Sequence, residues 1–174
     1  GLPDRISRAW VKDLSRFQTR SVVTTPHTTF DRTFLVEVSR GCPHGCRFCA
    51  AGYVYRPPRF SLPGNLADCI RKEKPGDVKI GLVGAAVSDL PGLEALCNDI
   101  SGDGTEVSFS SLRADALTDE LLTQLKNNSV KTATIAPDAG SESMRARINK
   151  GLSEADKNKA AAKLQTARIP NLKI

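Results

Sequence analysis

Three cysteines, Cys42, Cys46 and Cys49, lie within eight residues of one another in the run RGCPHGCRFCA at residues 40–50. Thiolates are soft ligands that select iron–sulfur clusters, zinc or copper(I). A cubane cluster has four irons, and the C-x3-C-x2-C spacing offers a thiolate to only three of them. The fourth iron would stay open to another molecule, which favours chemistry at the cluster over simple electron storage.

Zinc is the main alternative ligand for these thiols. His44 or His27 could complete a closed Cys3His site. Structural zinc sites usually draw their ligands from two separated segments, whereas these cysteines share one loop, so the pattern favours a cluster. A plain electron-transfer cluster is a third interpretation. Gly41 and Gly45 are expected to allow tight turns and backbone N–H contacts to sulfur.

The elements that must position the loop alternate between strand-like and helix-like patterns from residue 33 onward. The first predicted strand ends where the cysteine loop begins, and the loop runs to about residue 62. The helix at 93–100 is expected to end at the glycine-containing stretch 101–104. Thr118 and Ser153 are expected N-caps of the helices that follow them. The predicted strands are 33–39, 78–83, 106–111, 130–136 and 171–174, and the predicted helices are 64–74, 93–100, 119–128, 143–149 and 153–167.

Repeated strand–helix units of this kind predict parallel strands with right-handed crossovers. Four units and the start of a fifth make an α/β fold, a partial (β/α) barrel, because a complete barrel needs about 250 residues. Its active edge should be the carboxyl ends of the strands, where the cysteine loop lies. Residues 33–174 form this part, and residues 1–32 are predicted to be a lead-in or interdomain segment outside the sheet.

The composition is that of an ordinary globular domain of 174 residues with a net charge of +6. No stretch approaches the roughly 18 apolar residues of a membrane span, and no secretory leader or initiator Met opens the chain, so we expect a piece of a longer protein. An odd count of five cysteines, three of them clustered, favours the reducing cytosol. Cys69 and Cys97 are expected to be buried on apolar helix faces.

The basic residues near the end of the chain have two interpretations. Their helical spacing is typical of a solvated helix face. A nucleic-acid surface is the alternative, which the scarcity of stacking aromatics disfavours: the chain has one Trp and two Tyr. The residues concerned are Lys150, Lys157, Lys159 and Lys163.

The cysteine motif, with the aromatic Phe48 before its last cysteine, resembles the radical S-adenosylmethionine (SAM) superfamily. The run EVSRGCPHGCRFCAAGYVYRPPR at 37–59 is similar to members with an N-terminal cobalamin-binding domain. The stretches TPHTTF at 25–30, SLRAD at 111–115 and IAPDAGSE at 135–142 fit the same subgroup. A radical SAM enzyme that modifies tRNA, such as a methylthiotransferase, is the nearest alternative.

This resemblance implies an enzyme with a [4Fe–4S] cluster on Cys42, Cys46 and Cys49 and with SAM on the open iron. It also implies a reductant such as flavodoxin or ferredoxin, and cobalamin bound by a domain outside this chain. The family's Gly-Gly-Glu stretch is replaced by GAAVS at 84–88, without the acid. The SAM contacts implied by position are Phe48 at the adenine, Gly84 and Ser88 at the amino group, Ser111, Arg113, Asp138 at the ribose and Lys150 at the carboxylate.

Several of these residues have structural alternatives. Arg113 could instead form an ion pair with Asp115 or Asp138. Asp138 and Glu142 could cap the following helical turn. The residues Tyr53, Tyr55, Arg56 and Arg59 are expected to pack the long loop down rather than line the site. An incomplete barrel also predicts self-association that covers its open strand edge and apolar inner face.

Overall fold

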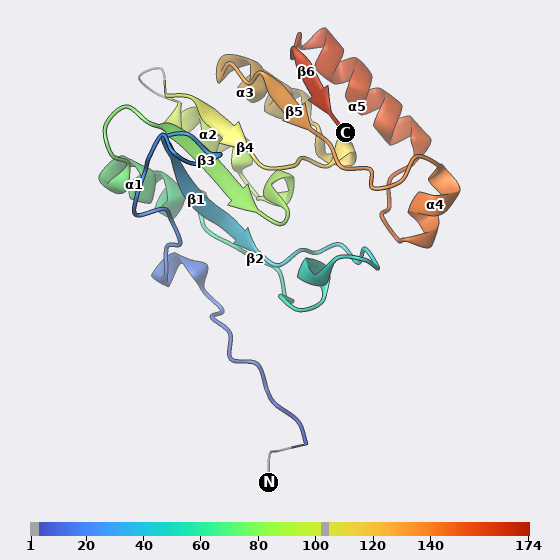
Figure 1. The fold of residues 1–174 in the computed structure, drawn as a ribbon, viewed down its shortest axis with the longest axis horizontal. Helices are drawn as coiled ribbons and strands as arrows, with labels where there is room; N and C mark the ends of the chain where they lie inside the picture. The colour runs from blue at the N-terminus through green and yellow to red at the C-terminus, as the bar shows by residue number, and fades with distance from the viewer. Residues whose placement is uncertain (1–3, 102–104) are drawn as a thin grey trace.

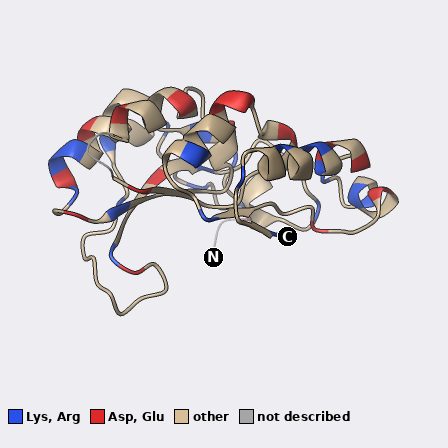
Figure 2. Ribbon diagram, turned by 90° about the horizontal axis from the view of Figure 1, so that it is seen from above, with Lys and Arg blue, Asp and Glu red and all other residues tan. Residues whose placement is uncertain are grey.

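The computed structural model describes residues 4–101 and 105–174, in which a layer of strands is covered on one side by helices (Figure 1). Seen from above, the helices stand on one side of the strand layer and carry basic and acidic residues intermingled (Figure 2). This arrangement is the α/β, partial-barrel core that the sequence predicts. No helix in the described residues is long and apolar enough to cross a bilayer.

In the described residues the strands form two sheets, which one isolated bridge joins. In the larger sheet the order is β2-β1-β3-β4, with β1, β3 and β4 parallel and β2 antiparallel to β1. The smaller sheet pairs β5 and β6 in parallel, and the bridge joins Leu112 to Ile135. The strand bounds are β1 Thr33–Arg40, β2 Arg59–Phe60, β3 Lys79–Gly84, β4 Val107–Phe109, β5 Thr132–Thr134 and β6 Asn171–Lys173.

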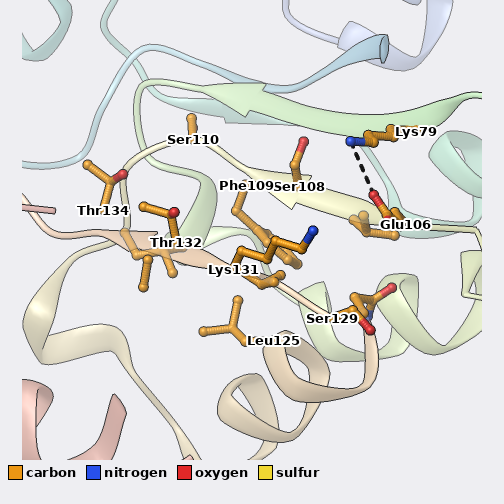
Figure 3. A pocket seen from close by; sticks show the side chains of 15 residues that line it. Lys79, Glu106, Ser108, Phe109, Ser110, Leu125, Ser129, Lys131, Thr132 and Thr134 are labelled. Carbon is orange, nitrogen blue, oxygen red and sulfur yellow. Dashed lines mark ion pairs between the residues drawn. The ribbon is translucent and has the colours of Figure 1, made fainter. Parts of the chain in front are cut away.

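Two features of the sheet differ from the prediction. The short strand β2, inside the predicted loop, was not predicted, because two residues carry no readable alternation. The strands β4 and β5 are shorter than the predicted 106–111 and 130–136, since in the described residues they do not pair with each other and their segments meet at the Leu112–Ile135 bridge beyond both strands. A cavity of about 240 Å³ fills the space between them (Figure 3).

The helices agree closely with their predicted positions. The Thr118 side chain accepts from the Leu121 N–H, and Ser153 forms a capping box with Asp156, as their places before acidic first turns predicted. Residues 102–104 of the predicted closure after α2 lie outside the described residues. The helix bounds are α1 Pro63–Glu73, α2 Leu93–Ile100, α3 Asp119–Asn127, α4 Glu142–Arg147 and α5 Glu154–Thr166.

In the described residues the hydrophobic core lies between the strands and the helices and extends from the larger sheet to β5 and α5. Alternate residues of β1, Phe34, Val36 and Val38, are buried in it, as the period of a strand requires. Cys69 and Cys97 are also buried in α1 and α2, as predicted, and burial raises the pKa of Cys97 to about 12. The opposite face of β1 is therefore left to polar residues near the cysteine loop.

The segment before β1 makes several contacts with the sheet. The Ser21 N–H donates to the Leu35 carbonyl at 2.9 Å, and the Glu37 N–H donates to the Thr19 carbonyl at 2.9 Å. Arg20 thereby forms an isolated antiparallel bridge with Val36, although the sequence predicts no role for residues 1–32 in the sheet. Residues 1–3 of that segment lie outside the described residues. The bridge covers the free edge of β1 beside β2.

Candidate functional site

The cysteine loop leaves the carboxyl end of β1 through a glycine with a left-handed backbone. Gly41 has φ +84°, and a Cβ at this position would collide with the Tyr55 carbonyl oxygen. Both facts require glycine at this position. The turn directs Cys42 and the residues after it across the carboxyl edge of the sheet, the edge predicted for the site.

All three cysteines of the loop are free thiols. Cys42 and Cys46 are buried and Cys49 is half-buried, and the Cys49 N–H donates to the Cys46 carbonyl at 3.1 Å. Burial raises the pKa of the Cys42 thiol, and the neighbouring Asp89 carboxylate adds to the shift. The loop thus presents three soft ligands, two of which are shielded from water.

No group of three or more His, Cys, Asp or Glu side chains within residues 4–101 and 105–174 is placed to hold a metal ion. A cubane does not need such convergence, because each cysteine binds a different iron at a separate corner. Three free thiols on one loop therefore fit a cubane with one open iron in number and in chemical type.

Aromatic and basic side chains hold the loop from its own later part. The Tyr53 hydroxyl donates to the Gly45 carbonyl at 3.0 Å, and Arg56 Nη2 donates to the Pro43 carbonyl at 3.0 Å. Arg59 is buried, donates to the Val11 carbonyl at 2.7 Å and lies 5.4 Å from the ring centre of Trp10. The predicted packing role is confirmed for Tyr53, Arg56 and Arg59.

A second set of contacts comes from the end of α4, about a hundred residues later. The Asn149 side-chain amide donates to the Gly45 carbonyl at 2.8 Å, and the Arg47 N–H donates to the Ile148 carbonyl at 2.9 Å. Arg47 Nη1 also donates to the Arg147 carbonyl at 2.5 Å. The sequence did not indicate Asn149, because one asparagine after a short helix carries no signal for so distant a contact.

A third contact joins the loop to the segment after β3. His44 Nε2 and Asp89 Oδ2 are 2.7 Å apart, with both side chains half-buried. Asp89 ends the short 3-10 turn Val87–Asp89, which follows the carboxyl end of β3. The His44 ring is thus fixed by a carboxylate of a neighbouring strand end.

The cationic residues implied at SAM both have partners in this structure. Arg113 pairs with Asp115 at 2.8 Å, and its guanidinium also donates to the Lys150 carbonyl at 3.4 Å. Lys150 pairs with Asp138, whose backbone is left-handed with φ 62°. Burial opposes the charged form of Arg113. The hydrogen bond to Asp115 and nearby negative charges outweigh the effect of burial, so the pKa of Arg113 is raised.

Two structural alternatives from the sequence are wrong. Neither Asp138 nor Glu142 caps α4, because Ser141 is the N-cap and accepts from the Met144 N–H; Glu142 instead accepts from the Glu154 N–H at 2.7 Å. Lys150 is also not part of a solvated helix face, since it precedes α5 and its side chain is 12% exposed.

The remaining predicted SAM contacts lie at several places around the loop. The Ser88 hydroxyl accepts from the Arg113 N–H at 3.3 Å, which joins the ends of β3 and β4. Gly84 ends β3 next to Ser39. A Cβ at residue 84 would collide with the Ser39 Oγ. Ser111 and Phe48 are exposed, and Phe48 retains 55% of its accessible surface. The structure thus brings Ser88, Arg113, Asp138 and Lys150 together, with Phe48 and Ser111 at the surface.

A cavity of about 590 Å³ adjoins the cysteine loop beside the carboxyl ends of β1 and β3. It is lined by Glu37 and Ser39 of β1, by Gly84 at the end of β3, and by Gly41 and Tyr55 of the loop. The Ser39 hydroxyl is buried and makes no hydrogen bond within the described part of the chain. The size of this cavity suits a small molecule held against the loop.

The cavity between β4 and β5 has a different character. Figure 3 shows Lys79 and Glu106, an ion pair at 3.3 Å, at one end of it, with Ser110 and Thr134 toward the other. No residue of the cysteine loop lines it, whereas Gly41, Ala51 and Tyr55 of that loop line the cavity of about 590 Å³, although none of its cysteines does. We therefore assign the candidate site to the cavity at the cysteine loop.

Arg145 is a buried residue that sequence reasoning missed. Its side chain is 0% exposed, and its guanidinium donates to the carbonyls of Leu152 at 2.8 Å and Gly140 at 2.7 Å. It also pairs with Glu154 at 2.7 Å. Arg145 thereby fastens the loop after β5, which carries Asp138, to the start of α5.

Comparison with known proteins gives two findings. The family model described as Radical SAM superfamily matches residues 36–174. The chain is also 40% identical over 137 residues to the uncharacterized protein MJ0966 of Methanocaldococcus jannaschii. That alignment includes 76% of this chain but 30% of the archaeal protein, so the chain spans less than a third of the length of this relative.

Proposed function

The chain belongs to the radical SAM superfamily, and from this premise we propose that it carries the cluster- and SAM-binding part of an enzyme that starts radical chemistry on a substrate. The observation that supports the proposal most strongly is the loop itself: three free thiols, two of them buried, beside a cavity of about 590 Å³. A cluster and a small cofactor are the partners that this combination of ligands and space accommodates.

In this proposal the residues of the chain bind and orient. Cys42, Cys46 and Cys49 each hold one iron of a [4Fe–4S] cluster. A cluster held by these cysteines would supply the electron for the reductive cleavage of SAM that starts radical chemistry. The residues proposed to orient SAM are Phe48 at the adenine, Asp138 at the ribose and Lys150 at the carboxylate. The Ser88 hydroxyl and the Gly84 backbone are proposed to contact the amino group of SAM, and Ser111 and Arg113 are proposed as further SAM contacts.

The charges near the loop support the orienting role of the two cations. Asp138 pairs with Lys150 and Asp115 pairs with Arg113, so both cations are already fixed before a ligand arrives. A preorganised group binds an anionic carboxylate with a smaller entropic cost than a free side chain. We propose that these pairs present their cations toward the loop and exchange part of their hydrogen bonding with the carboxylate of SAM.

We also propose which kind of radical SAM enzyme the chain comes from. The sequence run at 37–59 supports a cobalamin-linked enzyme, and a tRNA-modifying enzyme such as a methylthiotransferase is the alternative. A test is to purify the complete natural protein and assay it for bound cobalamin. Cobalamin in stoichiometric amount supports the first assignment, whereas a cobalamin-free protein whose deletion removes a tRNA modification supports the second.

Anaerobic reconstitution with iron and sulfide tests the proposal. The wild-type chain should turn brown and bind about four irons per chain. Addition of SAM should change the electron paramagnetic resonance spectrum of the reduced cluster. Cys42→Ala, Cys46→Ala and Cys49→Ala should each lose the cluster, whereas Cys69→Ala, which removes a thiol buried in α1, should retain it. A colourless wild-type chain with stoichiometric zinc would refute the proposal.

A further inference from the structure

A pair formed by a histidine and a carboxylate joins the cysteine loop to the segment after β3. His44 Nε2 and Asp89 Oδ2 are 2.7 Å apart, and both side chains are half-buried. The other histidine, His27, is exposed and forms no ion pair in the described part of the chain. A histidine held by a carboxylate is therefore particular to the cysteine loop among the residues that the structure describes.

His44 also contacts a cysteine directly. It lies between Cys42 and Cys46, the two buried cysteines of the loop. Burial raises the pKa of Cys42, and a hydrogen bond from the His44 backbone, which favours the thiolate, opposes that rise. His44 thus binds Asp89 with its ring and Cys42 with its backbone.

Asp89 has a fixed place in the fold. It ends the 3-10 turn Val87–Asp89, and its N–H donates to the Ala86 carbonyl at 3.2 Å. Val87 is buried in the hydrophobic core, so this turn is anchored beside the end of β3. A ring that is bound to the Asp89 carboxylate is therefore held in place relative to the sheet.

We propose that Asp89 is a positioning residue for the cluster, which acts through the His44 ring to keep the segment between Cys42 and Cys46 in its iron-binding conformation. The inference rests on the proposed function, because it concerns the cluster assigned there to the three cysteines. Carboxylates commonly orient metal-site residues through a histidine in proteins. The charge of Asp89 does not explain its place, since a carboxylate disfavours the nearby Cys42 thiolate. Its contribution is therefore the geometry of the pair.

The test measures the loss of iron from the reconstituted chain during dialysis against a chelator. Asp89→Ala removes the partner of the His44 ring, and its iron affinity should be about tenfold lower than that of wild type. Asp89→Asn keeps an acceptor oxygen for the ring, so this variant should retain iron as well as wild type does. Asp99→Ala, at an exposed carboxylate of α2, is the matched control and should also retain iron.

The reduction potential gives a second measurement. Asp89→Asn removes one negative charge beside the cluster, so its midpoint potential should be higher than that of wild type. A residue that only stabilised the fold would leave this potential unchanged. A redox titration followed by electron paramagnetic resonance measures it, and the Asp99→Ala potential should equal that of wild type.

A variant on the loop tests whether Asp89 acts through His44. His44→Ala should lose iron as Asp89→Ala does, and the double variant should lose no more than either one. His27→Ala, at an exposed histidine, is the matched control. Urea denaturation of the iron-free chains shows which variants are folded. If Asp89→Ala does not fold, His44→Ala decides the question by itself.

Equal iron retention in wild type, Asp89→Ala and His44→Ala would overturn the positioning role and leave the proposed function intact. Iron loss in Asp89→Asn as large as in Asp89→Ala would also overturn the positioning role, because the charge and not the geometry would then matter. A wild-type chain that binds no iron would refute the proposed function and the positioning role together.

Discussion

Asn149 is a single side chain that connects the cysteine loop to the end of α4. Its amide donates to the Gly45 carbonyl, and the next residue, Lys150, accepts from Arg113 and pairs with Asp138. One short segment therefore contacts the cysteine loop and the ends of β4 and β5. At the residue scale, this makes Asn149 a positioning residue for the loop.

Replacing Asn149 with glycine should weaken cluster binding while leaving the fold intact. Asn149 has φ 54°, so glycine keeps the backbone conformation and removes only the amide donor. Loss of a contact that orients metal ligands commonly costs about 10- to 100-fold in metal affinity. Iron retention during dialysis against a chelator measures this effect.

The matched control is Arg168→Gly, at another left-handed residue, φ 57°, beyond the end of α5. It should retain iron as well as wild type does. If Asn149→Gly also keeps iron as well as wild type, the amide contact has no positioning role.

Arg145→Met should strongly destabilise the chain. The substitution removes the donor from the carbonyls of Leu152, Ala139 and Gly140 and leaves Glu154 without its buried partner. The Leu152 carbonyl is a buried acceptor, and leaving such a group without its donor costs about 1–3 kcal/mol. Urea denaturation followed by circular dichroism gives the free energy of unfolding. Arg147→Met, on the exposed side of the same helix, should change it by less than about 0.5 kcal/mol.

At the scale of elements, β1 and β3 approach closely at their carboxyl ends. Ser39 of β1 pairs with Gly84 of β3, and a register irregularity lies between Glu37 and Ser39. The Ser39 hydroxyl occupies the space that a side chain at residue 84 would need. Glycine at the end of β3 therefore sets the distance between the two strand ends that border the loop cavity.

Gly84→Ala should cost about 1–3 kcal/mol of unfolding free energy, because the added methyl group overpacks this contact. Ser39→Ala alone should cost under about 1 kcal/mol, since the hydroxyl has no hydrogen-bond partner in the described residues. The double variant should be more stable than Gly84→Ala, because the closest clashing atom is gone. Urea denaturation of the three variants tests this, and additive costs would contradict the proposed contact.

At the scale of the whole molecule, the open sheet leads us to expect self-association. In the described structure β6 pairs only with β5, and its Leu172 side chain is 40% exposed. An unpaired strand edge offers hydrogen-bonding groups to a second copy. Light scattering coupled to size-exclusion chromatography should therefore show a mass that rises with concentration.

Leu172→Lys should shift this equilibrium toward the monomer, because a charge on an edge strand opposes pairing. Leu62→Lys, at an exposed leucine before α1, is the control and should leave the equilibrium unchanged. A wild-type chain that stays monomeric at high concentration would contradict the expectation.

The cytosolic location remains a prediction.

The sequence by itself determined the cysteine loop, the order of the strands and helices apart from β2, and the caps at Thr118 and Ser153, because these depend on local spacing and periodicity. It also indicated the family, since the three cysteines lie in one short motif. Only the tertiary structure decided that Asn149 reaches Gly45, that Lys150 pairs with Asp138, and that the sheet divides between β4 and β5. Contacts between residues up to a hundred positions apart depend on how the elements pack, and packing leaves no periodic signal in the residues that it joins.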